Sequence, residues 1–237
     1  MRKILSAMRR AIQDYDMIKP HDKIAVGVSG GKDSLALLCA LADYKKFSDV
    51  PFEVMGVTLD MGFEGTDFSP IAEMCHKMNI EYILKKTDIA EILFDIRKEK
   101  NPCSLCAKMR RGAVNDLATE YGCQKVALGH HNEDVIETFF LSLFYEGRLN
   151  CFSPVTYLSR KDIHVIRPLI YVAEGDIKGF AKRANLPVVH NPCPMDGVSK
   201  RQDMKDFINE KQALDHSFKT RMMHAIQTGL DDWKIEA

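Results

Sequence analysis

One short stretch constrains this chain more than any other: an apolar run over 23–28 leads into Ser29-Gly30-Gly31-Lys32-Asp33-Ser34. A second apolar run starts at Leu35, so the pattern predicts a buried strand, a tight turn and a helix. The two glycines let backbone N–H groups approach an anion without a Cβ in the way, and the helix N-terminus adds positive dipole. Lys32 adds a cation and the serine hydroxyls add donors. The turn therefore predicts a phosphate-binding site in an α/β protein.

This turn differs from a Walker A loop. Val26 stands where the first glycine of that motif would fall, and Asp33 follows Lys32 where the motif has Ser or Thr. The alternative interpretation is a glycine-rich strand-to-helix turn that binds no ligand.

Length and composition set the class of protein. The chain has 237 residues, of which 46% are hydrophobic, so we expect one ordered domain. Lys and Arg total 33, as do Asp and Glu, and a zero net charge neither supports nor excludes a nucleic-acid partner. No apolar run is long enough to span a bilayer. We therefore expect a cytoplasmic protein with no membrane partner, in which disulfides are rare.

Strand and helix patterns alternate along the chain. We expect strands over 23–28, 52–59, 81–86 and 125–128, and helices over 3–17, 34–46, 68–78, 104–121, 133–145 and 173–184, with a polar helical tail over 200–230. This order predicts a single Rossmann-like parallel sheet with helices on both faces and a ligand at the carboxyl ends of the strands. We divide the domain into an N-terminal helix (1–20), a nucleotide-binding core (21–190) and a C-terminal cysteine motif with a helical tail (191–237).

A C-x-x-C motif, Cys103 to Cys106, forms a second constellation. A helix starting near Ser104 would place positions 103, 106 and 110 on one face, so Arg110 would point toward the thiols. Cys193 is joined to this motif only by resemblance to a known family, and with it as a third thiolate the ligands suit an iron–sulfur cluster with one open iron. A closed zinc site with His190 as fourth ligand is the alternative, and buried free thiols are another.

The remaining four cysteines lack such spacing. Cys39 lies in an apolar helix pattern, and Cys75 and Cys123 lie near helix or strand edges, so all three are predicted to be small core residues. Cys151 has no partner spacing and is left without a role.

Polar residues at two further strand ends form a third constellation. Gly129, His130 and His131 follow the strand over 125–128, and Asp134 lies in the first turn of the next helix. Acids there could simply stabilise the helix N-terminus. Their position beside the phosphate turn instead favours Mg²⁺ binding, and Asp134 could also orient or deprotonate a nucleophile. Asp60, at the end of another strand, is predicted to lie beside adenosine or metal, or to cap its loop.

Taken together, these motifs resemble a known family. The hexapeptide from Ser29 to Ser34 resembles the pyrophosphate loop of the PP-loop ATP pyrophosphatases, which have the adenine nucleotide alpha hydrolase-like fold. Over roughly 20–205, the chain is similar to the tRNA 2-thiocytidine synthetase family. The motifs carrying this similarity are Ser29–Ser34, Pro102–Cys106 with Arg110-Arg111-Gly112, Leu128–Thr138, Val165–Leu169, and Cys193 followed by Arg201.

The resemblance implies a reaction and its cofactors. ATP adenylates the C2 oxygen of cytidine 32 in a tRNA anticodon loop, and sulfur then displaces AMP. The family holds a [4Fe–4S] cluster on three cysteines that match Cys103, Cys106 and Cys193. ATP and Mg²⁺ are the other expected cofactors. The expected partners are tRNA, a sulfur donor (a cysteine desulfurase or sulfide) and a second copy of the chain.

Residue roles follow from the motifs and the resemblance together. Lys32, Asp33, Arg110 and Asp134 are the candidate catalytic residues. The candidate nucleotide-binding residues are Ser29, Gly30, Gly31, Lys32, Asp33, Ser34, Asp60, Gly129, His130 and Asp134. The candidate RNA contacts are Arg2, Lys3, Arg9, Arg10, Lys108, Arg110, Arg111, Lys200, Arg201 and Lys205.

Other functions share part of this pattern. The single late cysteine, Cys193, also resembles the tRNA 2-thiouridine synthetases, which usually carry flanking zinc fingers that this chain lacks. An amine-adding PP-loop adenylating enzyme would use the cysteines for structural zinc, and a lysidine-forming enzyme would not need them. A universal-stress-type sensor would bind ATP without turning it over.

Overall fold

A six-stranded sheet organises the computed structural model, which describes residues 1–99, 102–189, 192–193 and 200–235. The strands lie in the order β3-β2-β1-β4-β6-β5, and every pair is parallel except β5–β6. The Rossmann-like prediction is confirmed. The strands are β1 (Lys23–Gly27), β2 (Glu53–Asp60), β3 (Glu81–Lys86), β4 (Lys125–Ala127), β5 (Val155–Leu158) and β6 (Ile163–Ile166).

The antiparallel hairpin β5–β6 was not predicted. Each of its strands has only four residues, and β5 lies at the sheet edge with its residues exposed or half-buried. Such short strands carry too little apolar alternation to be recognised from sequence.

The strand order changes direction between β1 and β4. From β1 the chain proceeds outward to β2 and β3, and it then returns to add β4 and β6 on the other side. The loops that follow β1 and β4 therefore lead to opposite faces of the sheet and leave a crevice between them. In open α/β sheets, ligands bind in this crevice at the carboxyl ends of the strands. The phosphate turn follows β1 and the segment Gly129–His131 follows β4, so both predicted constellations lie at this switch point.

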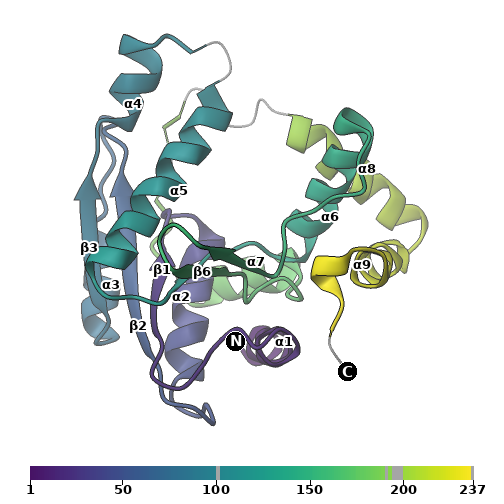
Figure 1. Cartoon of the computed structure of the whole chain (residues 1–237), viewed down its shortest axis with the longest axis horizontal. Helices are drawn as coiled ribbons and strands as arrows, with labels where there is room; N and C mark the ends of the chain where they lie inside the picture. The colour runs from purple at the N-terminus through teal and green to yellow at the C-terminus, as the bar shows by residue number, and fades with distance from the viewer. Residues whose placement is uncertain (100–101, 190–191, 194–199, 236–237) are drawn as a thin grey trace.

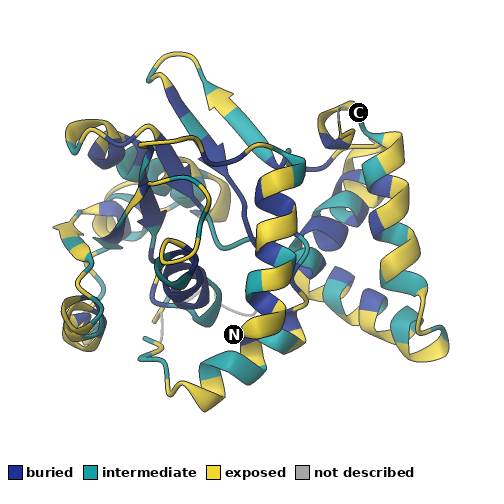
Figure 2. Cartoon of the chain, turned by 90° about the horizontal axis from the view of Figure 1, so that it is seen from below, coloured by how far each residue is buried: buried dark blue, intermediate teal, exposed yellow. Residues whose placement is uncertain are grey.

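Side chains alternate between the two faces of the sheet. Ile24 and Val26 of β1 belong to the large apolar core, whereas Ala25 packs with Leu117 in a smaller one. Figure 2 shows the buried strands between helices whose outer sides are exposed. The large core is covered by α1 (Arg2–Asp14), α2 (Lys32–Tyr44), α3 (Ser69–Lys77) and α7 (Glu174–Arg183), and the smaller one by α5 (Pro102–Glu120).

Three further helices form a bundle beside the sheet, on the side away from β3 (Figure 1). Phe140 lies at its centre, with ring centroids 5.5 Å from Phe207 and 6.1 Å from Phe218. The helices are α6 (Asn132–Leu141, continued by a π-helical turn over Ser142–Glu146), α8 (Lys200–Leu214) and α9 (Phe218–Gly229).

The polar helical tail predicted over 200–230 consists of two helices. In the turn between them, Asp215 accepts the backbone N–H of Ser217 (2.9 Å). A 3-10 turn over Asp231–Trp233 then buries Trp233 completely. Two short turns were also missed, α4 (Ile89–Glu91) and a π-helical turn over Ile92–Ile96. None of the helices in the described ranges is long and apolar enough to cross a membrane.

Candidate functional site

The phosphate turn is held in shape by its own hydrogen bonds. The Ser34 hydroxyl accepts the backbone N–H of Ser29 (3.1 Å) and donates to the carbonyl of Gly31 (2.9 Å). Gly30 has a φ of 87°, and a Cβ there would lie 3.1 Å from the Cβ of Val189. A left-handed backbone under such crowding needs glycine. The turn is therefore preformed, with the Ser34 hydroxyl already engaged in bracing it.

Gly129 allows two backbones to meet at the switch point. A Cβ on Gly129 would lie 3.0 Å from both the carbonyl carbon of Asp33 and the amide nitrogen of Ser34. These are backbone atoms that cannot rotate away, so only glycine permits this approach. The strand end after β4 is thereby packed against the first turn of α2.

Lys32 is held by two carboxylates. Its Nζ lies 3.0 Å from Oδ2 of Asp33 and 3.2 Å from Oε1 of Glu174, at the start of α7. Burial lowers the pKa of Lys32, but the charges and hydrogen bonds of the two acids outweigh it and raise the pKa overall. Lys32 is therefore a fixed cation beside the turn. The other Asp33 oxygen, Oδ1, is buried and accepts no hydrogen bond from the described residues.

His131 lies among several acids at the N-terminus of α6. Its Nε2 is 3.8 Å from Oδ1 of Asp33 and 3.5 Å from Asp134, and its Nδ1 is 3.4 Å from Glu133. Burial lowers the pKa of His131, but the nearby carboxylates of Glu133, Asp134 and Asp33 raise it overall. The imidazole thus links the phosphate turn to α6.

Glu133 connects α6 to α7 and α9. It accepts the backbone N–H of Glu174 (2.8 Å) and pairs with Lys219 (3.1 Å). Burial raises the pKa of Glu133, yet these partners and His131 bring it down to about 2. Glu133 therefore stays ionised and ties three elements together behind the phosphate turn.

Asp134 has a structural contact of its own. It accepts the backbone N–H of His131 (2.9 Å), which caps α6, and its other oxygen lies 3.6 Å from Arg201 of α8. Arg201 also lies 3.7 Å from Glu137, which is almost fully buried. Burial raises the pKa of Glu137 to about 7, and the Asp134 carboxylate adds to the rise while Arg201 opposes it.

His130 is a neutral imidazole at the same strand end. Burial lowers the pKa of His130 to about 4. The Asp134 carboxylate acts to raise this pKa, whereas Arg167 and Arg201 lower it further. Its ring lies 4.8 Å from that of Phe152, and its Nδ1 is buried without a hydrogen-bond partner in the described part of the chain.

Asp60 braces the loop after β2. Its side chain accepts the backbone N–H of Gly62 (3.0 Å) and its carbonyl accepts that of Thr87 (2.8 Å). This contact agrees with the loop-capping interpretation, and a role beside adenosine or metal stays a prediction.

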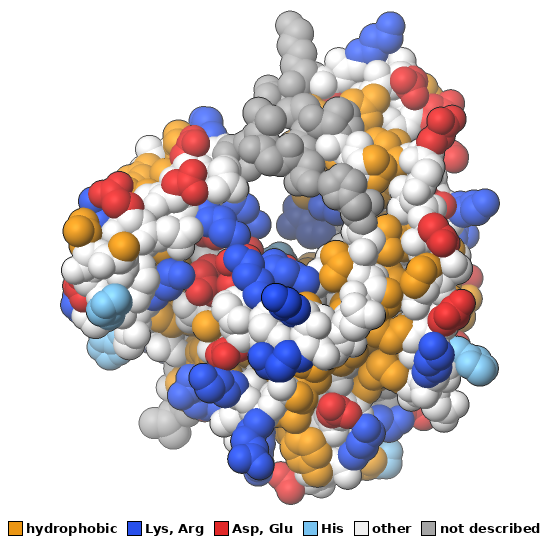
Figure 3. Space-filling view, turned by 180° about the vertical axis from the view of Figure 1, so that it is seen from behind, with side chains coloured by type: hydrophobic (Ala, Val, Ile, Leu, Met, Phe, Trp, Pro, Cys, Tyr) orange, Lys and Arg blue, Asp and Glu red, His pale blue; other side chains and the backbone are white. Residues whose placement is uncertain are grey.

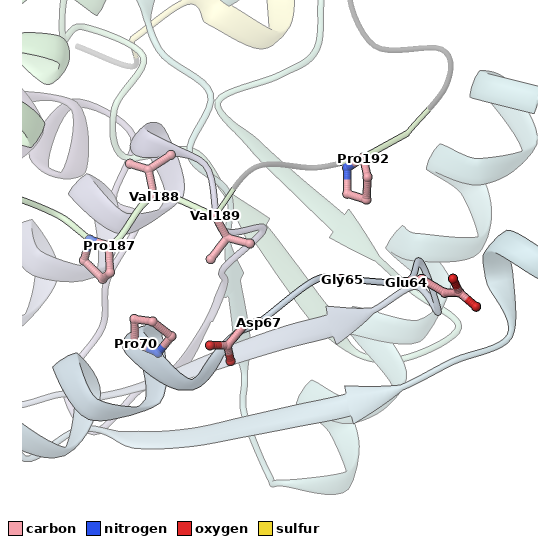
Figure 4. Close-up of a pocket in the computed structure, with 8 residues that line it drawn as sticks. All are labelled: Glu64, Gly65, Asp67, Pro70, Pro187, Val188, Val189 and Pro192. Carbon is pink, nitrogen blue, oxygen red and sulfur yellow. The ribbon is translucent and has the colours of Figure 1, made fainter.

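A pocket of 370 Å³ lies between this loop and the segment after α7 (Figure 4). The same segment contacts the phosphate turn, because Val189 donates its backbone N–H to the carbonyl of Gly30 (3.0 Å). The lining residues are Glu64, Gly65, Asp67, Pro70, Pro187, Val188, Val189 and Pro192.

The three candidate ligand cysteines lie close enough to influence one another. Cys103 is exposed, and Cys106 and Cys193 are half-buried. Burial raises the pKa of Cys106, Arg110 lowers it, and Cys193 and Cys103 raise it further. Arg110 and the other two thiols thus act electrostatically on Cys106. The Nε of Arg110 is buried with no hydrogen-bond partner among the described residues.

This donor set suits a soft metal centre, since thiolates favour iron–sulfur clusters and zinc. No three His, Cys, Asp or Glu side chains in the described ranges converge as ligands of a metal ion. The alternative zinc ligand, His190, lies outside the described residues.

The other cysteines are buried, which confirms three predictions. Burial raises the pKa of Cys39, Cys75 and Cys123 to about 11. Cys151, which had no predicted role, is buried as well, and its thiol lies 3.4 Å from the carbonyl of Val135.

Two acids of the site, Glu133 and Glu174, were missed by sequence reasoning. Glu133 lies between His131 and Asp134 in a segment that was recognised, but its partners come from α7 and α9. Glu174 lies after a different strand, and its only signal was its place in the first turn of the helix predicted over 173–184. Figure 3 shows a hollow in one face, with Lys and Arg side chains gathered around it and Asp and Glu side chains beside them.

Comparisons with known proteins agree with this geometry. The family model described as a PP-loop domain matches residues 2–211. The chain is 36% identical over 231 residues to the tRNA-cytidine(32) 2-sulfurtransferase of Geobacter sulfurreducens, covering 95% of this chain and 89% of the relative. It is 36% identical over 233 residues to the protein of that name from Paracoccus denitrificans, covering 95% and 76%.

Among solved structures, the chain is similar to the U34-tRNA thiolase NcsA from Methanococcus maripaludis with its [4Fe-4S] cluster. The TM-score is 0.79 at 24% identity, over 95% of this chain and 78% of that one. This likeness bears on the fold, while the identity to the sulfurtransferases over nearly the whole chain bears on the family. The chain belongs to the PP-loop family and, within it, to the tRNA-cytidine(32) 2-sulfurtransferases.

Proposed function

We propose that this protein uses ATP to activate the C2 oxygen of cytidine 32 in tRNA and replaces that oxygen with sulfur. One observation supports the proposal: the segment that leads to Cys193 is hydrogen-bonded to the phosphate turn. Val189 is hydrogen-bonded to Gly30 of the turn, and Cys193 follows it by four residues, a reach of at most about 14 Å. This connection supports a polyphosphate site and a sulfur site that lie near each other.

The chain's residues suit attack at the α phosphorus of ATP. The turn's N–H groups and Lys32 would hold the β and γ phosphates while the base oxygen bonds to the α phosphorus and pyrophosphate leaves. Asp33 and Asp134, which flank one nitrogen of His131, would hold Mg²⁺. Asp33 Oδ1, which accepts no hydrogen bond from the described residues, is the kind of hard oxygen ligand that this ion takes.

Asp134 is assigned to positioning rather than to proton removal. Neutral cytidine carries no proton at its C2 oxygen or its N3, so its attack on ATP requires no base. Asp134, fixed by the His131 amide and by Arg201, would instead orient the base or the metal.

Cys103, Cys106 and Cys193 would hold a [4Fe–4S] cluster, which when bound supplies an open iron to present sulfur. Arg110 would bind the oxyanion that leaves or the RNA backbone, since its unpartnered Nε and planar fork suit phosphate. The sulfur donor would be a cysteine desulfurase or sulfide.

The proposal extends to the whole chain. We propose that residues 1–237 act as a single PP-loop domain, in a cytoplasmic homodimer that binds tRNA through basic residues. Candidates on α1 are Arg2, Arg9 and Arg10, which line a groove of 610 Å³.

Metal analysis and a thiolation assay test the proposal together. Protein purified and reconstituted without oxygen should contain about four irons and four sulfides per chain, both lost in Cys193→Ala. With ATP and sulfide it should form 2-thiocytidine in a tRNA carrying C32 and none in the same tRNA carrying U32. One tight zinc without iron would instead indicate an amine-adding enzyme, and thiolation of a uridine would reassign the base.

A further inference from the structure

Glu174 brings together lysines from three helices. Its Oε1 lies 3.2 Å from Nζ of Lys32 and 3.1 Å from Nζ of Lys205, and its Oε2 lies 3.0 Å from Nζ of Lys178. Lys32 belongs to the phosphate turn, Lys178 to α7 and Lys205 to α8. Residues 173 positions apart in sequence therefore meet at one carboxylate oxygen.

The shared oxygen places the ammonium groups of Lys32 and Lys205 side by side. Like charges at such a distance repel and persist only with counter-charge between them. Burial raises the pKa of Glu174, but hydrogen bonds from Lys178, Lys205 and Lys32 bring it down to about 2. Glu174 is thus ionised and acts as the anchor of the pair.

Counted over its direct ion pairs, this cluster holds more positive than negative charge. Three ammonium groups face two carboxylates, those of Glu174 and Asp33. The side chains of Lys32 and Lys205 are 29% and 33% exposed, against 56% for Lys178. Charges that are partly withdrawn from water interact more strongly with an anion. A polyanion bound at the turn would therefore contact the ammonium groups of Lys32 and Lys205. Lys178, the most exposed of the three lysines, would remain in solvent.

We infer that Lys205 is a second polyphosphate-binding residue, which contacts the β or γ phosphate of ATP together with Lys32, and that Glu174 is the positioning residue for both. The inference rests on the proposed use of ATP and adds a ligand-binding residue from the C-terminal part of the chain. It differs from the sequence-based prediction that Lys205 contacts RNA.

The pairing also links two parts of the reaction site. α8 carries Lys205 and Arg201, and Arg201 contacts Asp134 and Glu137. α8 begins seven residues after Cys193. Polyphosphate binding would thereby hold in place the helix that follows the third cysteine.

Calorimetric binding of ATP, pyrophosphate and AMP to full-length protein tests the inference, because AMP lacks the phosphates that Lys205 would contact. Lys205→Ala should raise the Kd of ATP and pyrophosphate about tenfold, the usual effect of losing a charge-assisted hydrogen bond. The Kd of AMP should change less than about twofold. Lys205→Arg should recover part of the loss, since it keeps the charge.

Lys178→Ala is the matched control, because Lys178 also pairs with Glu174 but through the other oxygen. It should leave all three Kd values within about twofold. Glu174→Gln should weaken ATP and pyrophosphate binding, with Glu174→Asp intermediate.

Two results would overturn the inference while leaving the proposed function in place: unchanged pyrophosphate binding in Lys205→Ala, or an equal loss for AMP and pyrophosphate. The second would mean that Lys205 only supports the fold, and a lowered Tm would accompany it. If the unaltered protein bound neither ATP nor pyrophosphate, the proposed function and this inference would both fall.

Discussion

The two halves of the reaction site are built differently. The phosphate turn is braced by hydrogen bonds and ion pairs within the protein, through Ser34, Lys32 and Glu174. The cysteine side has one exposed thiol, Cys103, and two half-buried ones, Cys106 and Cys193, and no metal-ion ligand set is closed within the described ranges. An anion site can be preformed by backbone and side-chain donors, whereas a cluster site takes its geometry from the bound group.

This difference predicts that one substitution can abolish cluster binding without affecting ATP binding, and that another can do the reverse. The largest separation is expected for Cys103→Ala, which removes one of only three candidate thiolates. Iron content and formed 2-thiocytidine should both fall to background, while the Kd of ATP stays within about twofold. Cys123→Ala, a buried thiol near Met55, is the control and should retain iron. Loss of ATP binding in Cys103→Ala would show that the two halves depend on each other.

The reverse change is Lys32→Ala, on the phosphate side. AMP formation should fall about 100- to 1,000-fold, as on removal of one transition-state donor, while iron and sulfide content stay unchanged. AMP release would be followed with radiolabelled ATP and iron by colorimetry. If the variant also lost its iron, the proposed division of labour would be wrong.

A packing change tests how firmly the phosphate side is preformed. Gly129→Ala places a Cβ 3.0 Å from backbone atoms of Asp33 and Ser34 and should cost about 2 kcal/mol of unfolding free energy. It should weaken ATP binding as well, because α2 is displaced. Gly112→Ala is the control, since nothing lies within 4 Å of its Cβ and alanine favours the helix. Equal unfolding free energies of the two variants would show that the segment after β4 can move away from α2 without loss of stability.

The smallest expected effect concerns Glu137. Its pKa is raised from 4.5 to about 7 in the folded protein, so the folded state binds this proton more tightly than the unfolded state. Its contribution to stability is complete below pH 4.5 and is lost as pH rises through 7. At pH 8 the unfolding free energy of Glu137→Gln should therefore exceed that of the unaltered protein by about 1–2 kcal/mol. At pH 4.5 the two should differ little, and denaturant titrations at both pH values measure the difference.

The control for that measurement is Glu73→Gln, because Glu73 is exposed. Its stability should differ from that of the unaltered protein by the same small amount at both pH values. Equal stability differences for Glu137→Gln at pH 4.5 and pH 8 would mean that Arg201 neutralises Glu137 in the folded protein.

Much of this site follows from local sequence because its chemistry is local. The phosphate turn needs only a strand, two glycines and a helix in succession, and the alternation of strands and helices then places turn and Gly129 at the same edge. Cys39 was recognised as a core residue because it lies in an apolar helix pattern, and Cys75 and Cys123 because they lie near helix or strand edges without ligand spacing. The hairpin β5–β6 escaped because four-residue strands leave almost no periodic signal.

What only the tertiary structure decided is which distant charges meet. In the sequence Glu174 is an ordinary polar residue of an amphipathic helix and Lys205 is a candidate RNA contact, and nothing near them indicates the phosphate turn. They reach Lys32 because α7 and α8 fold back on the N-terminus of α2 and α6. Helix periodicity determines which side of a helix is buried, but the pairing of ions across helices depends on packing that no local pattern encodes.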